Sequence, residues 1–316
     1  MPSPSSGPVW AGRSRSSGRA PRPGSSRLRS SISDDRGETI VSNSSADVAG
    51  REVPPSGVDA SVPHSARVYD WWLGGKDNFA ADRAMGAALI EAIPTLRTMA
   101  KENRAFVHRV ARYLVGEAGI RQFIDIGTGI PTRPNLHEVA QAIAPETRVV
   151  YVDNDPIVLA HARALMISTE QGRSEYIHAD LREPEKILAD ERLTGTLDLD
   201  RPVALTLIAV LMLLRDSDDP AGLLRTLMEA LPSGSYLAIT HPTQDFNPAE
   251  MSAAVAAATQ GHMTLVPRTR AEVERFFDGW ELVEPGIAPV MAWRPEDGEP
   301  DDPHAAYYWA GLARKP

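Results

Sequence analysis

From residue 122 to residue 241 the chain alternates between short apolar runs and segments of helical periodicity. The runs QFIDIG, RVVYVDND, SEYIHADL, PVALTLIAV and GSYLAITH have the length and composition of buried strands. Amphipathic stretches such as NLHEVAQAIA and PAGLLRTLMEAL lie between them. Strands that are separated by helices of this length form right-handed βαβ units. The alternation therefore predicts an α/β fold with a mostly parallel sheet that is covered by helices.

The two ends of the chain follow other patterns. Residues 1–61 are rich in Ser, Pro, Gly and Arg and predict a disordered tail, because they bury too little apolar surface to offset the ordering entropy. Residues 62–119 contain two amphipathic helical patterns and predict an N-terminal helical cap on a main domain of residues 120–316. Near the end, WELVEPGIAPVMAW and AAYYWAGLARK predict two strands. Their link is too short for a crossover helix, so we expect an antiparallel hairpin.

Composition narrows the possible functions. The net charge of −9 gives no electrostatic reason to bind nucleic acid. The absence of cysteine excludes disulfides and thiol catalysis and favours a reducing cytoplasm. No apolar run is long enough to predict a membrane span, and the eight histidines are scattered without metal-ligand spacing. We therefore expect no metal and no membrane partner, and the sequence leaves the oligomeric state open.

The segment FIDIGTGIPT is the sharpest local motif. A strand runs into Gly127 and Gly129, and glycines at such a turn let a ligand approach the backbone. Asp125 precedes the turn, Asp153 ends the next strand and Asp180 ends the third. Parallel strands present their carboxyl ends at one edge of the sheet, where ligands of open α/β sheets bind. A carboxylate at the second of these ends can accept both ribose hydroxyls, and one at the third can reach an adenine amino group.

The glycine turn alone does not identify the ligand, because such turns also serve packing, and a strand-end aspartate can be a helix N-cap. A dinucleotide fingerprint requires a third glycine, where this chain continues with Ile-Pro-Thr. An acid before the glycines suits a ligand that carries an ammonium and a sulfonium better than one that carries two phosphates. A nicotinamide-dependent oxidoreductase is therefore the weaker interpretation.

Three stretches, SARVYDWWLGGKDNFAADR, FIDIGTGIPTRPNLHEVAQ and VVYVDNDPIVLAHARALM, resemble the S-adenosyl methyltransferase family that is common in actinobacteria. The resemblance runs from about residue 62 to the C-terminus. It implies a Rossmann-like class I methyltransferase fold, with a seven-stranded, mostly parallel sheet of order 3-2-1-4-5-7-6, a C-terminal antiparallel hairpin and a helical N-terminal addition. It also implies S-adenosyl-L-methionine as the cofactor. The contacts expected from the strand ends are Asp125, Gly127, Thr128, Gly129, Asp153, Asn154, Asp180, Leu181 and Ala209.

The aromatic cluster RVYDWWLGGKDN has two possible roles. Tyr69, Trp71 and Trp72 can form a wall that faces the sulfonium, and the Gly74-Gly75 pair permits a close backbone approach. Alternatively, the tryptophans dock the N-terminal helices on the sheet, and Asp77 caps the helix that follows. The two roles are compatible. We predict Tyr69 and Gly75 as further cofactor contacts.

No catalytic dyad is evident, and methyl transfer requires alignment of the reactants more than a base. His241 follows the fifth strand and is the candidate base, with a polar loop histidine as its alternative interpretation. Where relatives commonly read AVLHF, this chain has AVLML, so no histidine stands at that position. The sequence thus predicts an S-adenosylmethionine-dependent methyltransferase with a small-molecule acceptor. The alternative is a non-catalytic, regulatory module that binds S-adenosylmethionine or S-adenosylhomocysteine.

Overall fold

The computed structural model describes residue 54 and residues 58–165, 168–296 and 298–316. The chain separates into two units, Met1–Arg51 and Glu52–Pro316, and every described residue lies in the second. The sequence predicts a tail at residues 1–61. Of this tail, residues 1–53 and 55–57 lie outside the described residues. No helix in the described part of the chain is long and apolar enough to cross a membrane.

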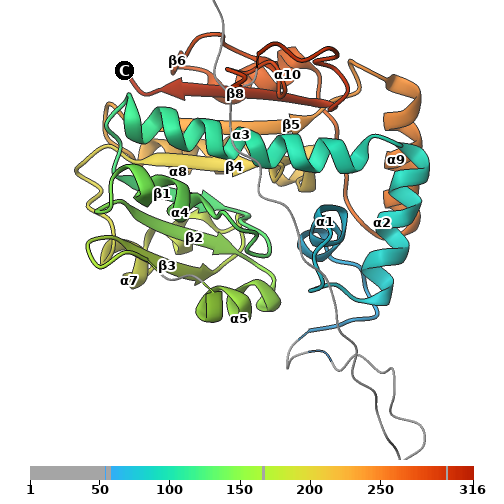
Figure 1. Ribbon diagram of the computed structural model, residues 1–316, viewed down its shortest axis with the longest axis horizontal. Helices are drawn as coiled ribbons and strands as arrows, with labels where there is room; N and C mark the ends of the chain where they lie inside the picture. The colour runs from blue at the N-terminus through green and yellow to red at the C-terminus, as the bar shows by residue number, and fades with distance from the viewer. Residues whose placement is uncertain (1–53, 55–57, 166–167, 297) are drawn as a thin grey trace, which may run out of the picture. The chain divides into compact units, whose positions relative to one another are not determined.

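A single mixed sheet forms the centre of the unit, in the order β3-β2-β1-β4-β5-β8-β6, with β7 also paired to β8 (Figure 1). The first five strands of this order are parallel, and β8 runs antiparallel to β5. This confirms the predicted fold class and strand order. The strands are β1 (Gln122–Ile126), β2 (Arg148–Asp153), β3 (Arg173–His178), β4 (Ala204–Ile208), β5 (Tyr236–Pro242), β6 (Glu281–Leu282), β7 (Ala288–Pro289) and β8 (Tyr308–Arg314).

The predicted C-terminal hairpin exists, but its first strand is divided. β6 and β7 both pair antiparallel with β8 and are separated by a break in the ladder. Pro285 and Gly286 lie in this break. Proline has no N–H to donate to a ladder, and Gly286 has a positive φ of 80°, which turns the chain away from an extended path. The sequence pattern of one continuous strand missed this interruption.

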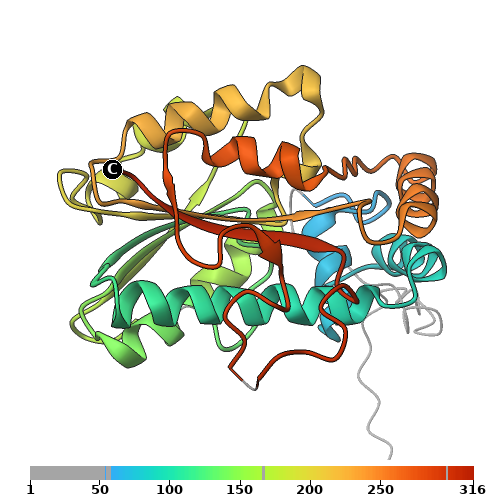
Figure 2. The ribbon, with the colours of Figure 1, turned by 90° about the horizontal axis from the view of Figure 1, so that it is seen from above.

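Helices cover both faces of the sheet (Figure 2). One face carries α3 (Leu96–Gly116), α4 (Leu136–Ile143) and α5 (Pro156–Leu165). The other carries α6 (Pro184–Leu188), α7 (Glu191–Thr194), α8 (Pro220–Glu229) and α10 (Arg270–Glu274), with 3-10 turns at Leu211–Leu213, Asp216–Asp218 and Arg275–Phe277.

The strand residues alternate between two hydrophobic clusters because successive side chains of a strand point to opposite faces. Phe123 and Val149 pack in the cluster under α3, whereas Ile124 and Val150 pack in the cluster under α8. All four side chains are at most 1% exposed. The sheet is thus buried on both sides, as a parallel sheet must be, and it holds the carboxyl ends of its strands in fixed positions.

The N-terminal helices α1 (Ser65–Leu73) and α2 (Ala80–Ala92) lie beyond the carboxyl ends of the parallel strands, and α2 packs beside α9 (Pro248–Gln260) (Figure 1). Helix α1 ends at Gly74, whose φ of 86° closes the helix in the left-handed conformation that glycine permits. The N-cap of α2 is Phe79, whose N–H donates to Asp82 Oδ2 over 2.8 Å. The cap that the sequence assigned to Asp77 is therefore wrong. The backbone N–H of that residue donates to Asp70 instead.

Candidate active site

A cavity of about 340 Å³ lies at the carboxyl ends of the parallel strands. Its floor comes from the turns that follow β1, β2, β3 and β4. Its walls come from α1, from the sides of α2 and α3, and from α9 and the segment that follows it. Ligand sites of open α/β sheets occupy this edge, so the cavity lies where the topology predicts a site.

The glycine turn after β1 depends on positive φ angles. Gly127 and Gly129 have φ values of 70° and 67°. The Gly127 N–H donates to Val152 O over 2.7 Å, and the Gly129 N–H donates to Asp153 Oδ2 over 2.8 Å. A Cβ atom at Gly127 would lie 2.2 Å from Val210 Cγ2. The turn after β1 is therefore held close to the end of β2 and to the loop after β4.

We expect Gly127→Ala to lower the free energy of unfolding by about 2–4 kcal/mol. Alanine is strained at this positive φ, and its Cβ would also collide with the Val210 side chain. Gly116→Ala is the matched control, since a Cβ there meets nothing within 4 Å and φ is not positive. That control should be neutral or slightly stabilising. Urea denaturation of both variants tests the prediction, and a Gly127→Ala variant as stable as wild type contradicts it.

Two of the three strand-end acids are buried beside this turn. Asp125 accepts the Thr206 hydroxyl, and Asp153 accepts the N–H groups of Gly129 and Asp155. Burial raises the pKa of both carboxyl groups above the ordinary aspartate value. A ligand cation or a pair of ligand hydroxyls would stabilise the ionised forms, so these acids favour a ligand that carries such groups.

Asp180 follows β3 on a more open part of the cavity. Burial raises its pKa, but the Arg182 backbone N–H, the Asn154 amide and the Arg182 charge together lower it more. The Asn154 amide donates to Asp180 Oδ2 over 3.1 Å. The net pKa shift is downward, so this carboxylate stays ionised and can accept from a polar ligand edge.

Most of the sequence-predicted contacts meet at the cavity. Those that line it are Tyr69, Asp125, Gly127, Thr128, Gly129, Asp153, Asn154, Asp180, Leu181 and Ala209. Gly75 is exposed and does not line it. A Cβ at Gly75 would lie 1.9 Å from Asp70 Oδ1, so this glycine lets the chain pass over Asp70. The structure thus gives Gly75 a packing role.

The structure also places His241 away from the cavity. Its side chain is fully buried and stacks on the Phe276 ring, and Nε2 lies 2.9 Å from Arg268 Nη1. Burial first, and then the nearby Arg268 charge, lower the pKa of this histidine to about 3. His241 therefore belongs to the interior between β5 and α10, and it cannot reach a ligand in the cavity.

The aromatic cluster divides between the two expected roles. Tyr69 and Trp72 line the cavity, and Trp72 Nε1 also donates to Gly86 O over 3.2 Å. Trp71 does not line it, and the Arg97 guanidinium stacks 4.7 Å from its ring centroid. Helix α1 is therefore docked on α2 by its tryptophans and presents Tyr69 to the cavity.

Sequence reasoning missed two polar residues of α3 that line the cavity. Asn103 is 1% exposed, and Arg104 donates from Nη2 to Thr132 O and Pro134 O, which lie in the segment between the glycine turn and α4. The signal was present in the helical spacing. Asn103 lies four residues after Met99 and four before Val107, so it is a polar residue on an apolar stripe.

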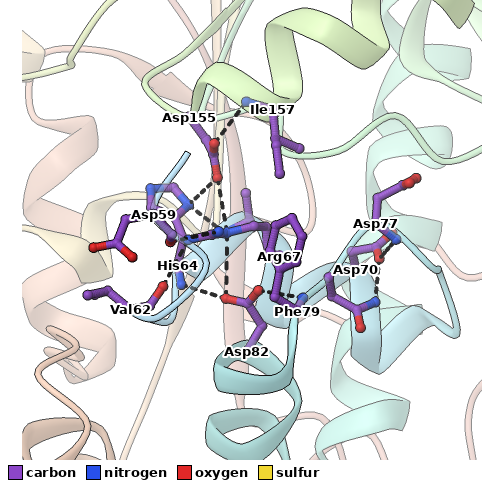
Figure 3. Close-up of polar contacts among 12 residues, drawn as sticks. Asp59, Val62, His64, Arg67, Asp70, Asp77, Phe79, Asp82, Asp155 and Ile157 are labelled. Atoms are coloured by element: carbon purple, nitrogen blue, oxygen red, sulfur yellow. Dashed lines mark hydrogen bonds and ion pairs between the residues drawn. The ribbon is translucent and has the colours of Figure 1, made fainter. Parts of the chain in front are cut away.

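Sequence reasoning also missed a buried ionic cluster that fastens α1, shown in Figure 3 and called here the Arg67 clasp, which comprises His64, Arg67, Asp82 and Asp155. Arg67 Nε lies 3.5 Å from Asp82 Oδ1 and 3.5 Å from Asp155 Oδ2. Its Nη atoms donate to Asp59 O and Val62 O. One guanidinium thus joins the entry to α1, the start of α2 and the start of α5.

His64 completes the clasp. Its Nδ1 lies 2.9 Å from Asp155 Oδ2, and its backbone N–H donates to Asp82 Oδ1 over 2.8 Å. Burial raises the pKa of Asp155, but His64 and the Arg67 charge lower it more, so the net shift is downward. The same Nδ1 lies 3.4 Å from the Ala66 backbone N–H, which it accepts as the N-cap of α1. The clasp thus joins α1 to Asp155, which lies two residues after Asp153 in the sequence.

The profile of the S-adenosyl methyltransferase family matches residues 51–316. A crystal structure of a DUF574 family protein from Streptomyces avermitilis is 48% identical, covers 82% of this chain and 99% of its own, and superposes with a TM-score of 0.80. A Thermobifida fusca protein described as a candidate methyltransferase is 42% identical, with coverage of 83% and 98% and a TM-score of 0.75. A comparison with curated proteins gives no match.

The donor set fits S-adenosyl-L-methionine, which has an ammonium, two ribose hydroxyls and an adenine edge to be bound. The glycine turn leaves room for a ligand against the backbone at Gly129, and the two acids beside it are buried, where ligand donors would stabilise their ionised forms. The family match covers most of the chain, including every described helix and strand. The chain belongs to the S-adenosyl methyltransferase family and is an S-adenosyl-L-methionine-dependent methyltransferase.

Proposed function

We propose that this enzyme methylates a small molecule that binds in the same cavity as the cofactor. The observation that carries the proposal is the composition of the cavity. One end is lined by the acids and glycines of the strand ends, and the other by apolar side chains of α2, α3 and α9. A charged cofactor and an apolar acceptor can thus lie side by side in one cavity.

For the cofactor end we assign roles from the chemistry of each group. Asp153 accepts the ribose hydroxyls, and Asp125 neutralises the ammonium of the amino-acid part. Asp180 and Asn154 bind the adenine amino edge, against the apolar side chain of Leu181. The positions of these residues at successive strand ends support the assignment.

Arg104 supplies a positive charge, which the cofactor contacts assigned above lack. It lines the cavity, and its positive charge lowers the pKa of Asp125, so the two groups are neighbours. S-adenosylmethionine carries a carboxylate next to its ammonium, and an arginine binds a carboxylate strongly through charge-assisted hydrogen bonds. We assign the cofactor carboxylate to Arg104.

Arg104→Met is expected to weaken S-adenosylhomocysteine binding about tenfold, a typical loss for one charge-assisted contact. Affinity for 5′-methylthioadenosine, which lacks the amino-acid part, should stay unchanged. Arg112→Met on the same helix is the control, since Arg112 pairs with the exposed Glu296 and does not line the cavity. Calorimetric titration of both ligands tests the assignment, and an equal loss for both ligands would refute it.

S-adenosylmethionine supplies a methyl group that its sulfonium already activates. The protein then has to align the acceptor and exclude water.

Incubation of the enzyme with methyl-tritiated S-adenosylmethionine and cell extract tests the function. We expect label in the small-molecule fraction. Label in protein or nucleic acid would overturn the small-molecule acceptor. Cofactor binding without any labelled product would favour the regulatory module.

The net charge of −9 supports the exclusion of nucleic acid, and the two similar crystal structures support an actinobacterial source. The cofactor is a cytoplasmic metabolite, which supports a cytoplasmic enzyme.

A further inference from the structure

The apolar end of the cavity, called here the acceptor chamber, is lined by Leu89, Ile93, Met99, Val107, Met251 and Met263. Its methionines can adapt their shape to a ligand, because the thioether side chain is unbranched and polarizable. The acids after β1, β2 and β3 line the cavity apart from this set in the fold. Asp70 of α1 also lines the cavity, and its carboxylate already accepts the Asp77 N–H and the Asn78 amide. The chamber therefore suits an uncharged, largely apolar ligand.

Asn103 brings one polar side chain to this cavity, and its orientation is determined by its neighbour. The Tyr69 hydroxyl donates its only proton to Ala100 O over 2.9 Å. Its oxygen can then only accept from Asn103, whose Nδ2 lies 3.2 Å away. The amide nitrogen therefore faces Tyr69, and the carbonyl oxygen Oδ1 is the atom left over.

Asn103 Oδ1 has no hydrogen-bond partner among the described residues, although the side chain is 1% exposed. Several other buried polar atoms in the described part of the chain also have no partner, such as Tyr176 Oη and Trp293 Nε1. Of these, Asn103 Oδ1 is the one whose residue lines the cavity. Native proteins pair nearly all buried polar atoms, so an unpaired acceptor in a side chain of the cavity wall points to a donor on the ligand.

We infer that the methyl acceptor is an uncharged, largely apolar molecule with a hydroxyl or N–H group that donates to Asn103 Oδ1. The inference rests on the proposed function, because it identifies the class of molecule that the same cavity takes. Asn103 is a positioning residue in this scheme. The Tyr69 hydroxyl fixes its amide, and the amide then fixes one end of the acceptor.

A matched pair of probes tests the inference. 1-Naphthol and 1-methoxynaphthalene share an apolar body, but only 1-naphthol can donate a hydrogen bond. Each is titrated by calorimetry into enzyme saturated with S-adenosylhomocysteine. We expect wild type to bind 1-naphthol at least fivefold more tightly, and Asn103→Leu to bind the two probes equally.

Val107→Ala is the control, because it shortens an apolar wall of the chamber one helical turn from Asn103. It should weaken the binding of both probes and keep the ratio of their dissociation constants. Asn103→Ala serves as a second variant, with the same expected loss of preference, should leucine prevent folding. Affinity for S-adenosylhomocysteine is measured for all three variants first, so that each probe is titrated into saturated enzyme.

The outcomes separate the inference from the proposed function. If wild type binds S-adenosylhomocysteine but binds neither probe, or both equally, the inference is overturned and cofactor binding stands. A preference that persists in Asn103→Leu and Asn103→Ala also overturns it. Failure of wild type to bind S-adenosylhomocysteine counts instead against the proposed function.

Discussion

Asp153→Ala is expected to bind S-adenosylhomocysteine at least tenfold more weakly than wild type. The substitution removes the carboxylate that we assign to the ribose hydroxyls. It also removes the acceptor of two backbone N–H groups, at Gly129 and Asp155, over 2.8 and 3.0 Å. The first of these belongs to the glycine turn, so the variant loses both a ligand contact and the bond that holds the turn in place. Two hydrogen bonds to a charged group justify a loss of this size.

Calorimetric titration measures the effect, with Asp200→Ala as the control because Asp200 is exposed and does not line the cavity. Asp153→Asn adds a graded comparison, since it keeps one acceptor oxygen and should lose less affinity than Asp153→Ala. Unchanged affinity in Asp153→Ala would refute the ribose assignment. A loss of the same size in Asp200→Ala would show that the effect is not specific to the site.

Asp82→Ala is expected to lower the free energy of unfolding by about 3–5 kcal/mol, the usual effect of removing one partner of a buried ion pair. The Asp82 side chain is fully buried and lies 3.5 Å from Arg67 Nε. It also accepts the N–H groups of His64 and Phe79, each over 2.8 Å. Its loss therefore leaves a buried guanidinium with fewer partners and unpairs the backbone where α1 and α2 begin.

Thermal denaturation tests this second prediction, with Glu91→Ala on the same helix as the exposed control. For a unit of this size we expect a fall in Tm of about 10 °C in Asp82→Ala. The control should stay close to wild type. A melting temperature for Asp82→Ala that equals that of Glu91→Ala would show that the Arg67 clasp does not stabilise the N-terminal helices.

The fold followed from the sequence because its signals are local. Strand and helix periods, and the turn residues between them, can be identified within a few positions. A parallel sheet then places the ends of β1, β2 and β3 at one edge without further information. Asp125, Asp153 and Asp180 could for that reason be predicted to meet at one cavity.

Other features depended on contacts between distant segments. Asn103 was not singled out: its helical spacing indicates a position on an apolar stripe, but its partner Tyr69 lies 34 residues earlier. His241 looked like a loop residue at the ligand-bearing edge, and its burial depends on Arg268 and Phe276. Gly75 was likewise predicted as a cofactor contact, whereas the structure shows that a side chain at this position would collide with Asp70. No periodicity within one segment predicts such pairs.

The strand-end cavity is expected to bind the methyl donor, and calorimetric titration of the wild-type protein measures this binding. We predict one binding site per chain for S-adenosylmethionine and one for S-adenosylhomocysteine, with each ligand excluding the other. The predicted dissociation constants lie in the micromolar range or below. No heat for either ligand at high micromolar concentration would show that the cavity is not the site of the methyl donor.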